Sequence, residues 1–578
     1  MSQQFNQVKV ANTSRSTFDL SHHQVTTTDF GYLIPICVRD MVPNDDFVVK
    51  PSLFCRLAPM AFPTYGRITC RVHSFFVPYR ILYGHWHEFI TKAQGNRTLP
   101  PFFTVSSLRQ ALQSDPQFGS GTSLRRGTYG RLMANLGLNP DLLMSQEGLG
   151  ANDRISAFRF LAYYRIYIDY FMDSNINNHS VMDADFKALV RDGGSLIARS
   201  TEFLKTRNVC YSKDYFTTAK LNPQAGDASR VGVGISLNDF ENNWKSQQPV
   251  TSSIGDIDGV LTITDSQSGS EVQLGPSGYN TLGFTVEDLR AAVSLQRYLE
   301  RNNYVGSKVI NQLLAHFGIA PTPERLDMAE YIGGSNFPIQ IGDVTSTTPS
   351  SSGSAGVATI GLGAQAGKGI GAAQSETVRY HAKEHGVFMT LLSILPDTGY
   401  YQGIPKEFQL GVFGDPLDYY TPEFENLGFQ EILNKEVYVP YSYDQYEDYD
   451  ADGIFGYSPR YAFMKFQRDI LAGDFVGNLS GSSVMGSQMD SWHLFRKLRY
   501  DDQFPLALND NFVECNNKNE DYDRIFQVTN SDLDHFYFNI DVDVKATRPM
   551  VGFAEPSLEE VKTGDGNSIN LPYGGTRL

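Results

Sequence analysis

The alternation of apolar and polar residues predicts strands near both ends of the chain. Residues 535–545 alternate with a period of two, and their apolar side consists of Phe536, Phe538, Ile540, Val542 and Val544. This pattern is typical of an antiparallel strand with one buried face. Nearer the N-terminus, Arg67–Tyr83 first alternates and then runs apolar, and Pro78 indicates a strand edge or exit.

A continuous apolar run predicts a strand that is buried on both faces. Val387–Leu395 (VFMTLLSIL) is short and partly β-branched, follows Gly386 and ends before Pro396. A run of this length between Gly and Pro favours a buried strand over a helix.

Helical patterns cluster in the middle of the chain. Arg154–Phe171 is apolar on nearly all sides, which predicts a helix packed over most of its surface. Thr285–Asn302 begins with Thr285 and Asp288 in the spacing of a capping box and continues with apolar residues near helical spacing. Gly306–Gly318 predicts a further helix that ends at its last glycine.

Two segments have the composition of surface additions. Pro223–Phe284 is rich in Gly, Ser, Asp and Asn and contains the strand-like pieces GVLTITD and EVQLG, so it is interpreted as a β-rich insertion outside the core. Asp343–Ser375 is rich in Gly, Ser and Thr, and we expect it to be mobile.

His381, Glu384 and His385 form H-x-x-E-H, the motif of one class of zinc peptidases. The motif needs a helix, which places residues i and i+4 on one face close enough to share an ion. Here a Gly/Ser-rich segment precedes the motif and a predicted strand follows it. Positions i and i+4 of a strand lie roughly 13 Å apart. We interpret the three residues as polar positions leading into the strand, and a zinc-dependent hydrolase remains the alternative.

Two other motifs are incomplete. Asp448, Asp450, Asp452 and Gly453 match the first half of an EF-hand loop, but Pro459 stands where the bidentate Glu is required. We interpret this segment as a solvated acidic loop, and the sequence leaves its calcium binding open. GLGAQAGKGIG (residues 361–371) lacks the first Gly and the final Ser or Thr of a phosphate-binding loop and is rejected.

Arg125, Arg126 and Arg131 surround Tyr129 in SLRRGTYGRL. Cations that neutralise a phosphate backbone, together with an aromatic ring that stacks on bases, suit single-stranded nucleic acid. The three arginines are therefore the candidate DNA contact, with a solvated basic loop as the alternative. No residue is assigned as catalytic, cofactor-binding or metal-binding.

Composition narrows the function classes. The net charge of −16 over 578 residues argues against a chain devoted to coating nucleic acid. A low charged fraction of 19% with 12% aromatic residues indicates surface that is buried again against other copies or partners. The five cysteines include no C-x-x-C pair, so we expect neither a zinc ribbon nor a disulfide framework, and folding in a reducing cytoplasm. The sequence shows no signal peptide and no apolar run long enough to span a membrane.

Six stretches, taken together and in order, resemble the major capsid proteins of the Microviridae, the small single-stranded-DNA phages, and especially their gokushovirus-type branch. The stretches are Ser16–Phe47, His73–Tyr83, Arg325–Ile339, Tyr419–Ile432, Phe455–Phe466 and Lys545–Met550.

The resemblance implies an eight-stranded antiparallel viral jelly roll with long inserted loops and a few helices. Identical subunits would form a small T=1 icosahedral shell around circular single-stranded DNA, with a scaffolding protein acting during assembly. A small basic DNA-binding virion protein would supply most of the neutralising charge. The region matching 223–284 would project outward from the shell toward a host surface receptor.

We therefore predict a structural coat protein without enzymatic activity or cofactor, assembled in the bacterial cytoplasm and carried in the virion. Residues 1–222 would form the first part of the jelly-roll core with inserted loops and helices. Residues 223–284 would form the outward insertion, and 285–578 a helical insertion and the second part of the core. Besides the zinc hydrolase, an extracellular β-sandwich adhesin is an alternative, although it would need an export signal.

Overall fold

The structure is a computed structural model. It describes residues 15–92, 99–115, 128–145, 148–196, 200–226, 253–257, 260–264, 271–274, 286–345, 365–412, 415–440, 449–476, 489–498, 507–516, 522–527 and 534–550. Two compact units divide the chain: Met1–Leu221 with Ser307–Leu578, and Asn222–Gly306.

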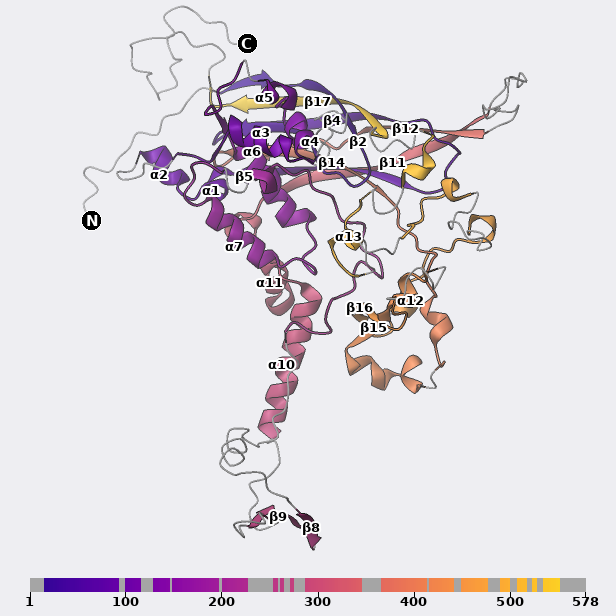
Figure 1. Cartoon of the computed structure of the whole chain (residues 1–578). Coiled ribbons are helices and arrows are strands. Elements are labelled where there is room, and N and C mark those ends of the chain that lie inside the picture. The colour runs from indigo at the N-terminus through magenta and orange to yellow at the C-terminus, as the bar shows by residue number, and fades with distance from the viewer. Residues whose placement is uncertain are drawn as a thin grey trace, which may run out of the picture. The chain divides into compact units, whose positions relative to one another are not determined.

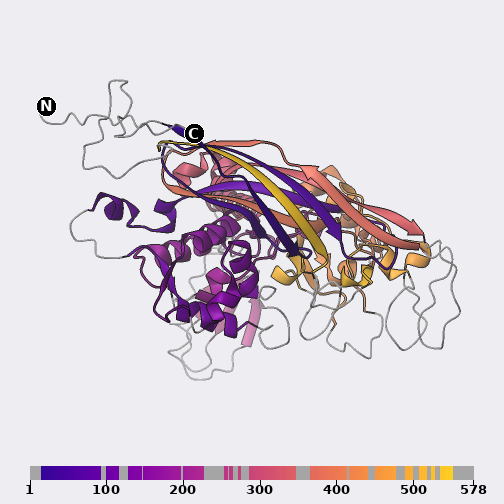
Figure 2. The ribbon, with the colours of Figure 1, turned by 90° about the horizontal axis from the view of Figure 1, so that it is seen from above.

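One large, curled antiparallel sheet forms the centre of the first unit (Figures 1 and 2). Its strand order is β1-β17-β4-β12-β11-β5-β14-β3, with β2 also paired to β17 and β13 also paired to β4. The strands are β1 (Ser16–Asp19), β2 (His22–Thr28), β3 (Ile34–Met41), β4 (Asp46–Leu57), β5 (Ile68–Pro78), β11 (Glu330–Thr345), β12 (Gln365–Gln374), β13 (Val378–His381), β14 (Gly386–Pro396) and β17 (Phe536–Arg548).

The ten strands follow eight paths across the sheet. β1 and β2 pair one after the other with β17, and β12 and β13 pair in the same way with β4. One half of the sheet is β1/β2-β17-β4-β12/β13, and the other is β11-β5-β14-β3. β11 links the halves, because its first part pairs with β5 and its last part with β12. This is the strand order of a jelly roll, so the predicted fold is confirmed.

The two strands with the clearest sequence patterns behave as predicted. Along β17, residues facing the core alternate with exposed residues from Phe536 to Lys545. Every residue of β14 is buried. β14 lies between β3 and β5, and helix α6 (Phe158–Ile166) packs against it. Its continuous apolar sequence therefore reflects cover on both faces.

The prediction that Asp343–Ser375 is mobile is wrong for residues 343–345, which end β11, and for residues 365–374, which form β12 between β11 and β4. Residues 346–364 lie outside the described residues. Glycine weakens a strand on its own, but neighbouring groups leave no room here for larger residues. A Cβ on Gly367 would lie 2.5 Å from the carbonyl oxygen of Phe62, and one on Gly369 would lie 2.6 Å from the Leu57 side chain.

A long insertion, residues 79–329, separates β5 from β11. Its α4 and α6 pack against the sheet at β3, β5 and β14 (Figure 1), and α3 packs against α4 and α8. Outside the second unit its elements are α1 (Tyr79–Leu82), α2 (Trp86–Thr91), β6 (Phe102–Thr104), α3 (Val105–Gln113), α4 (Thr128–Asn135), α5 (Pro140–Met144), β7 (Arg154–Ser156), α6, η2 (Tyr167–Phe171), α7 (His179–Val190), α8 (Ser200–Leu204), α11 (Val309–Phe317) and η4 (Pro323–Leu326).

The helix predicted over Arg154–Phe171 is present from Phe158 onward, but its first residues form strand β7, paired with β6. Its last residues form a π-helical turn, η2. The helix predicted to end at Gly318 is confirmed as α11, and Gly318 closes it in the left-handed conformation.

A second insertion, residues 397–535, joins β14 to β17. It shares a second, small apolar core around Phe216, Tyr438, Phe455 and Phe512 with the first insertion. Its elements are η5 (Lys406–Gln409), η6 (Pro416–Asp418), η7 (Pro422–Leu427), β15 (Phe429–Leu433), α12 (Asn434–Val437), β16 (Ile454–Pro459), η9 (Ala462–Met464), η10 (Gly473–Phe475), η11 (Asp490–Trp492), α13 (Asp510–Val513) and η12 (Tyr522–Ile525).

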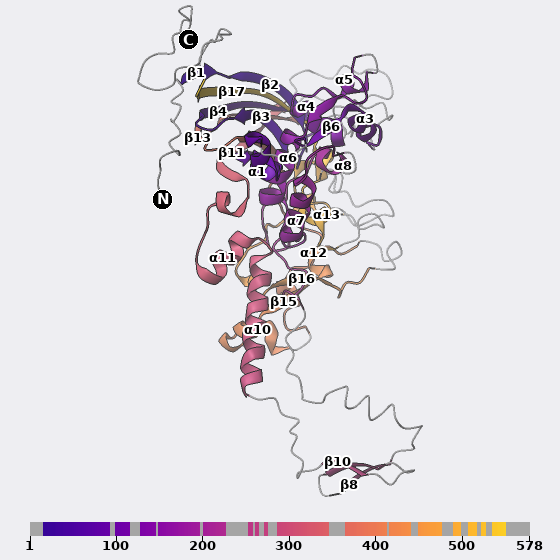
Figure 3. The same cartoon turned by 90° about the vertical axis from the view of Figure 1, so that its left-hand side faces the viewer.

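The second unit, Asn222–Gly306, contains the predicted insertion together with helix α10 (Val286–Val305). The three short strands β8 (Ser253–Ile257), β9 (Val260–Thr264) and β10 (Glu271–Leu274) form an antiparallel sheet (Figure 3). The strand-like pieces GVLTITD and EVQLG therefore do form strands. The helix predicted over Thr285–Asn302 is confirmed as α10, and its predicted cap at Thr285 lies outside the described residues.

His493 fastens the second insertion to the loop after β4. Its backbone bridges to Tyr65, its side chain is 3% exposed, and its ring contacts those of Tyr401 and Phe495. Burial, assisted by the Arg524 guanidinium, lowers the pKa of His493 from 6.5 to about 4. The imidazole of His493 is therefore harder to protonate in the folded state than in the unfolded chain.

We expect the free energy of unfolding to fall as the pH drops from about 6.5 to about 4, because in this range the unfolded state binds more protons at His493 than the folded state does. Urea unfolding at a series of pH values measures this slope. His493→Gln should make it shallower, whereas the same change at the exposed His87 should not. An unchanged slope in His493→Gln would contradict this account.

Candidate binding pocket and assembly surface

A cavity of about 600 Å³ opens between strands β2 and β3 and helix α4. Most of the titratable groups that line it are bases. They are His22, His23, Arg39, Arg131 and Arg159, and Asp534 is the acid among them. In a chain of net charge −16, this lining makes the cavity a locally basic region.

Arg131 is held inside the fold rather than offered to solvent. Its two terminal nitrogens donate to the two carboxylate oxygens of Asp534 at 3.0 and 2.9 Å, and its guanidinium lies 4.4 Å from the centre of the Tyr32 ring. Burial acts to lower the pKa of Arg131, but the charge and hydrogen bonds of Asp534 outweigh it and raise the pKa. The pair joins α4 to the residues that lead into β17.

The DNA contact of the three arginines stays a prediction, and the structure changes the interpretation of Arg131 alone. Arg125 and Arg126 lie outside the described residues. Arg131 is 5% exposed and its guanidinium is engaged by Asp534, so its position corresponds to a structural role in the free subunit. The alternative interpretation, a solvated basic loop, does not apply to Arg131 either, because this residue is buried.

Among the arginines that line the cavity, Arg39 keeps a side-chain N–H group that donates to no other described residue. Its Nη1 reaches the carbonyl of Val38 at 3.4 Å, and its buried Nε has no hydrogen-bond partner among the described residues. Burial lowers the pKa of the neighbouring His22, and the Arg39 charge lowers it further. On the opposite side, Arg159 donates to Asp40 at 2.7 Å.

The H-x-x-E-H residues are directed to separate partners. His381 ends strand β13, and its Nδ1 lies 2.6 Å from Asp46. Glu384 accepts from Arg80 at 3.0 Å, and the ring of His385 packs against Trp86. The segment leads into β14, as interpreted from the sequence. It has no helix that could place both imidazoles on one ion.

In the acidic loop, Asp448 lies outside the described residues. Asp450 accepts from the backbone of Asp452 at 3.1 Å, and Asp452 pairs with Lys435 at 2.5 Å. One aspartate of the loop therefore accepts from the loop's own backbone and another from a nearby lysine, and calcium binding there stays untested.

A third of the large apolar side chains that are exposed on the described residues belong to the second insertion. The most exposed are Phe408 and Ile470, at 78% and 77%. We call this set the 404–476 surface. It comprises Ile404, Phe408, Val412, Tyr419, Tyr420, Leu427, Val439, Ile454, Met464, Phe466, Ile470 and Val476. Exposed apolar groups in such number make this insertion a candidate for surface that a partner covers.

Comparison with known proteins agrees with the fold. Residues 6–558 match the family described as Capsid protein (F protein). The chain belongs to this capsid protein family. Capsid protein VP1 of Chlamydia phage 1 is 26% identical over 97% of this chain and 98% of the relative. Capsid protein VP1 of Bdellovibrio phage phiMH2K is 26% identical over 96% and 97%, and that of Spiroplasma virus 4 is 23% identical over 85% and 86%.

The predicted resemblance to microvirus capsid proteins is thereby confirmed. The capsid protein is a structural subunit of an oligomeric virion shell rather than an enzyme. None of its described helices is long and apolar enough to cross a membrane.

Sequence reasoning missed the pocket residues other than Arg131. His22, Arg39 and Arg159 come from two strands and a helix, and Asp534 follows more than 370 residues after Arg159. No spacing in the sequence signals such a group, because the sheet pairing brings its members together.

Arg131→Ala in the capsid protein should lower the free energy of unfolding by about 3–5 kcal/mol, because it leaves the Asp534 carboxylate buried without its partner. Urea unfolding of the full chain measures this decrease. Arg56→Ala, on the exposed side of β4, is the matched control and should change stability by no more than about 0.5 kcal/mol. A decrease of similar size in both variants would argue against the structural role.

Proposed function

We propose that the capsid protein assembles into a small T=1 icosahedral shell that encloses circular single-stranded DNA, and that the 404–476 surface forms a contact between subunits. The observation that carries this proposal is the concentration of exposed aromatic and aliphatic side chains on the second insertion.

A second copy of the chain is the proposed occupant, because closed symmetry requires each contact patch to match another patch on the same chain. The segment is well suited to serve as a contact platform. It packs with residues of the first insertion in a shared apolar core, β15 and β16 pair with each other, and the Tyr461 hydroxyl donates to the carbonyls of Leu417 and Tyr419. Its exposed groups are therefore held in place before association, which lowers the entropic cost of binding.

The double variant Phe408→Asp/Ile470→Asp should fold but fail to assemble, since it places two charges where apolar contact is proposed. Negative-stain electron microscopy and sedimentation should show free subunits in place of closed shells. Because both residues are exposed, the unfolding free energy should change by about 0.5 kcal/mol or less.

The matched control is Val181→Asp, which alters a single exposed apolar residue on α7 and should still form shells. Normal yields of shells from the double variant would refute the proposed contact.

We further propose that the cationic cavity receives phosphates of the enclosed DNA. Arg39, Arg159 and two histidines line it, and a phosphate oxygen would give the buried Nε of Arg39 an acceptor. Arg125 and Arg126 are retained as further contacts. A small basic virion protein would supply most of the remaining neutralisation for an acidic coat of charge −16.

Arg39→Gln should weaken binding of single-stranded DNA and reduce the slope of log K against log salt by roughly 0.7, because one phosphate is no longer neutralised. Binding measured over a salt series tests this. Arg56→Gln removes an exposed arginine from β4 and should leave the slope unchanged. A slope in Arg39→Gln equal to that of the unmodified protein would exclude this role.

The remaining partners belong to the same proposal. Residues 223–284 would project outward and contact a host surface receptor, and their short three-stranded sheet would provide a compact exposed module. A scaffolding protein would act while subunits assemble in the bacterial cytoplasm.

A further inference from the structure

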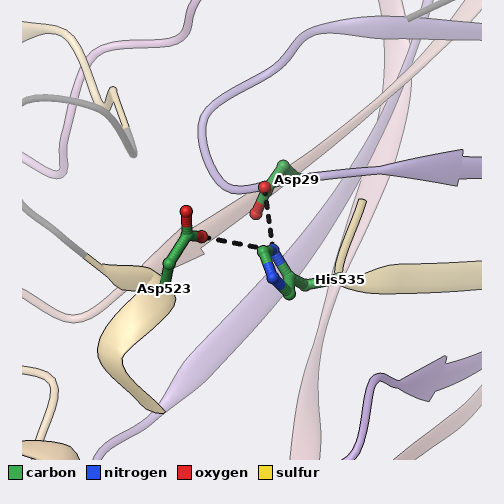
Figure 4. A group of neighbouring side chains, drawn as sticks. All are labelled: Asp29, Asp523 and His535. Atoms are coloured by element: carbon green, nitrogen blue, oxygen red, sulfur yellow. Dashed lines mark hydrogen bonds and ion pairs between the residues drawn. The ribbon is translucent and has the colours of Figure 1, made fainter. Parts of the chain in front are cut away.

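Two carboxylates and an imidazole converge at the point where the second insertion returns to the sheet (Figure 4). Asp29 follows β2, Asp523 belongs to η12, and His535 directly precedes β17. His535 Nδ1 lies 3.0 Å from Asp29 Oδ2 and 3.2 Å from Asp523 Oδ1. Three segments far apart in the sequence thus each contribute one group that can bind a metal ion.

Asp29 and His535 are buried and Asp523 is partly exposed, and contacts outside the cluster orient the two buried members. The His535 side chain is 1% exposed, and its ring stacks on Phe526 with centroids 4.1 Å apart. The other carboxylate oxygen of Asp29 accepts from the backbone of Phe30 at 2.8 Å. Such outer hydrogen bonds and packing are the arrangement that orients ligands in metal sites.

The backbones that carry two of the ligands are tied to the same loop. The carbonyl of His535 accepts from Ala58 at 2.7 Å, and the carbonyl of Ile525 in η12 accepts from Ala61 at 3.0 Å. The positions of Asp523 and His535 therefore depend on the fold rather than on flexible side chains alone.

The geometry suits a divalent ion shared by the three groups. Both carboxylates face the same nitrogen, and the three ligand atoms lie close enough together to bind one ion. Zinc bonds of about 2.0–2.1 Å in a tetrahedral site place ligand atoms roughly 3.3–3.4 Å apart. The observed separations of 3.0 and 3.2 Å need only a slight expansion.

The combination of one imidazole and two carboxylates favours zinc over calcium. An imidazole nitrogen with carboxylate oxygens suits zinc, whereas calcium takes six to eight oxygen ligands. We propose that Asp29, Asp523 and His535 bind one Zn²⁺ ion, which fastens the end of the second insertion to the sheet at the start of β17. Three protein ligands leave the fourth position of a tetrahedral zinc ion to water, and binding of the ion to the folded chain adds to stability.

The test compares two Asp→Asn variants of the full chain. Asp523→Asn removes one proposed ligand with little change of shape. Asp46→Asn is the matched control, because Asp46 also faces a histidine Nδ1, that of His381 at 2.6 Å, outside the cluster. Each protein is equilibrated with zinc, dialysed into metal-free buffer and measured by elemental analysis and thermal unfolding.

The unmodified protein and Asp46→Asn should retain about one zinc per chain, and the chelator EDTA should lower the Tm of both. Asp523→Asn should retain none above background, and EDTA should leave its Tm unchanged. Equal zinc in Asp523→Asn and the unmodified protein would overturn the proposal.

A second measurement needs no variant and so does not depend on the folding of Asp523→Asn. Titration of the unmodified protein with Co²⁺ should produce visible absorption bands that added zinc abolishes. If the unmodified protein neither retains zinc nor shows such bands, the cluster is an ion-pair network alone and the proposal fails.

Discussion

The pairing of β17 with β4 is the constraint on which the rest of the fold depends. It runs through twelve successive positions, from Phe536–Leu57 to Thr547–Asp46. β17 also provides the partner for β1 and β2, so without it both neighbours would expose unpaired backbone groups. The second insertion must therefore end beside Leu57 of β4, where the pairing of β17 begins. The Arg131–Asp534 pair and the His535 cluster lie where it does so.

Several arginines in this acidic protein form ion pairs and hydrogen bonds inside the fold. Arg165 is fully buried and bonds Asp169, whose carboxylate also accepts from the backbone of Ala329. Arg496 is 1% exposed and bonds the Tyr400 hydroxyl. Arg165 also pairs with Asp183 of α7, and Arg496 also donates to the carbonyl of Phe512, so each links separate parts of its insertion. With Arg131, three guanidinium groups are thus taken up inside the fold rather than placed on the surface.

The sequence was informative where a residue's environment follows from its own segment. The alternation of β17, the apolar run of β14 and the periodicity of α10 and α11 each reflect local burial, so all four elements were predicted. The segment that forms β12 was predicted to be mobile because the reason for its glycines is not local. They are required by close contacts with Leu57 and Phe62, which lie elsewhere in the sequence. The pocket and the His535 cluster could not be predicted, since sheet pairing brings together residues hundreds of positions apart.

The long insertion between β5 and β11 leaves and re-enters the sheet at adjacent positions, because Phe76 pairs with Glu330. Its two ends are thus held together whatever lies between them. Doubling the length of a loop with fixed ends costs only about 0.6 kcal/mol of chain entropy. The helices of the insertion that pack on the sheet are bound to it, but the separate unit within the insertion, Asn222–Gly306, could change in length without redesign of the jelly roll. Related phages could therefore exchange this unit, and foreign peptides could be displayed there.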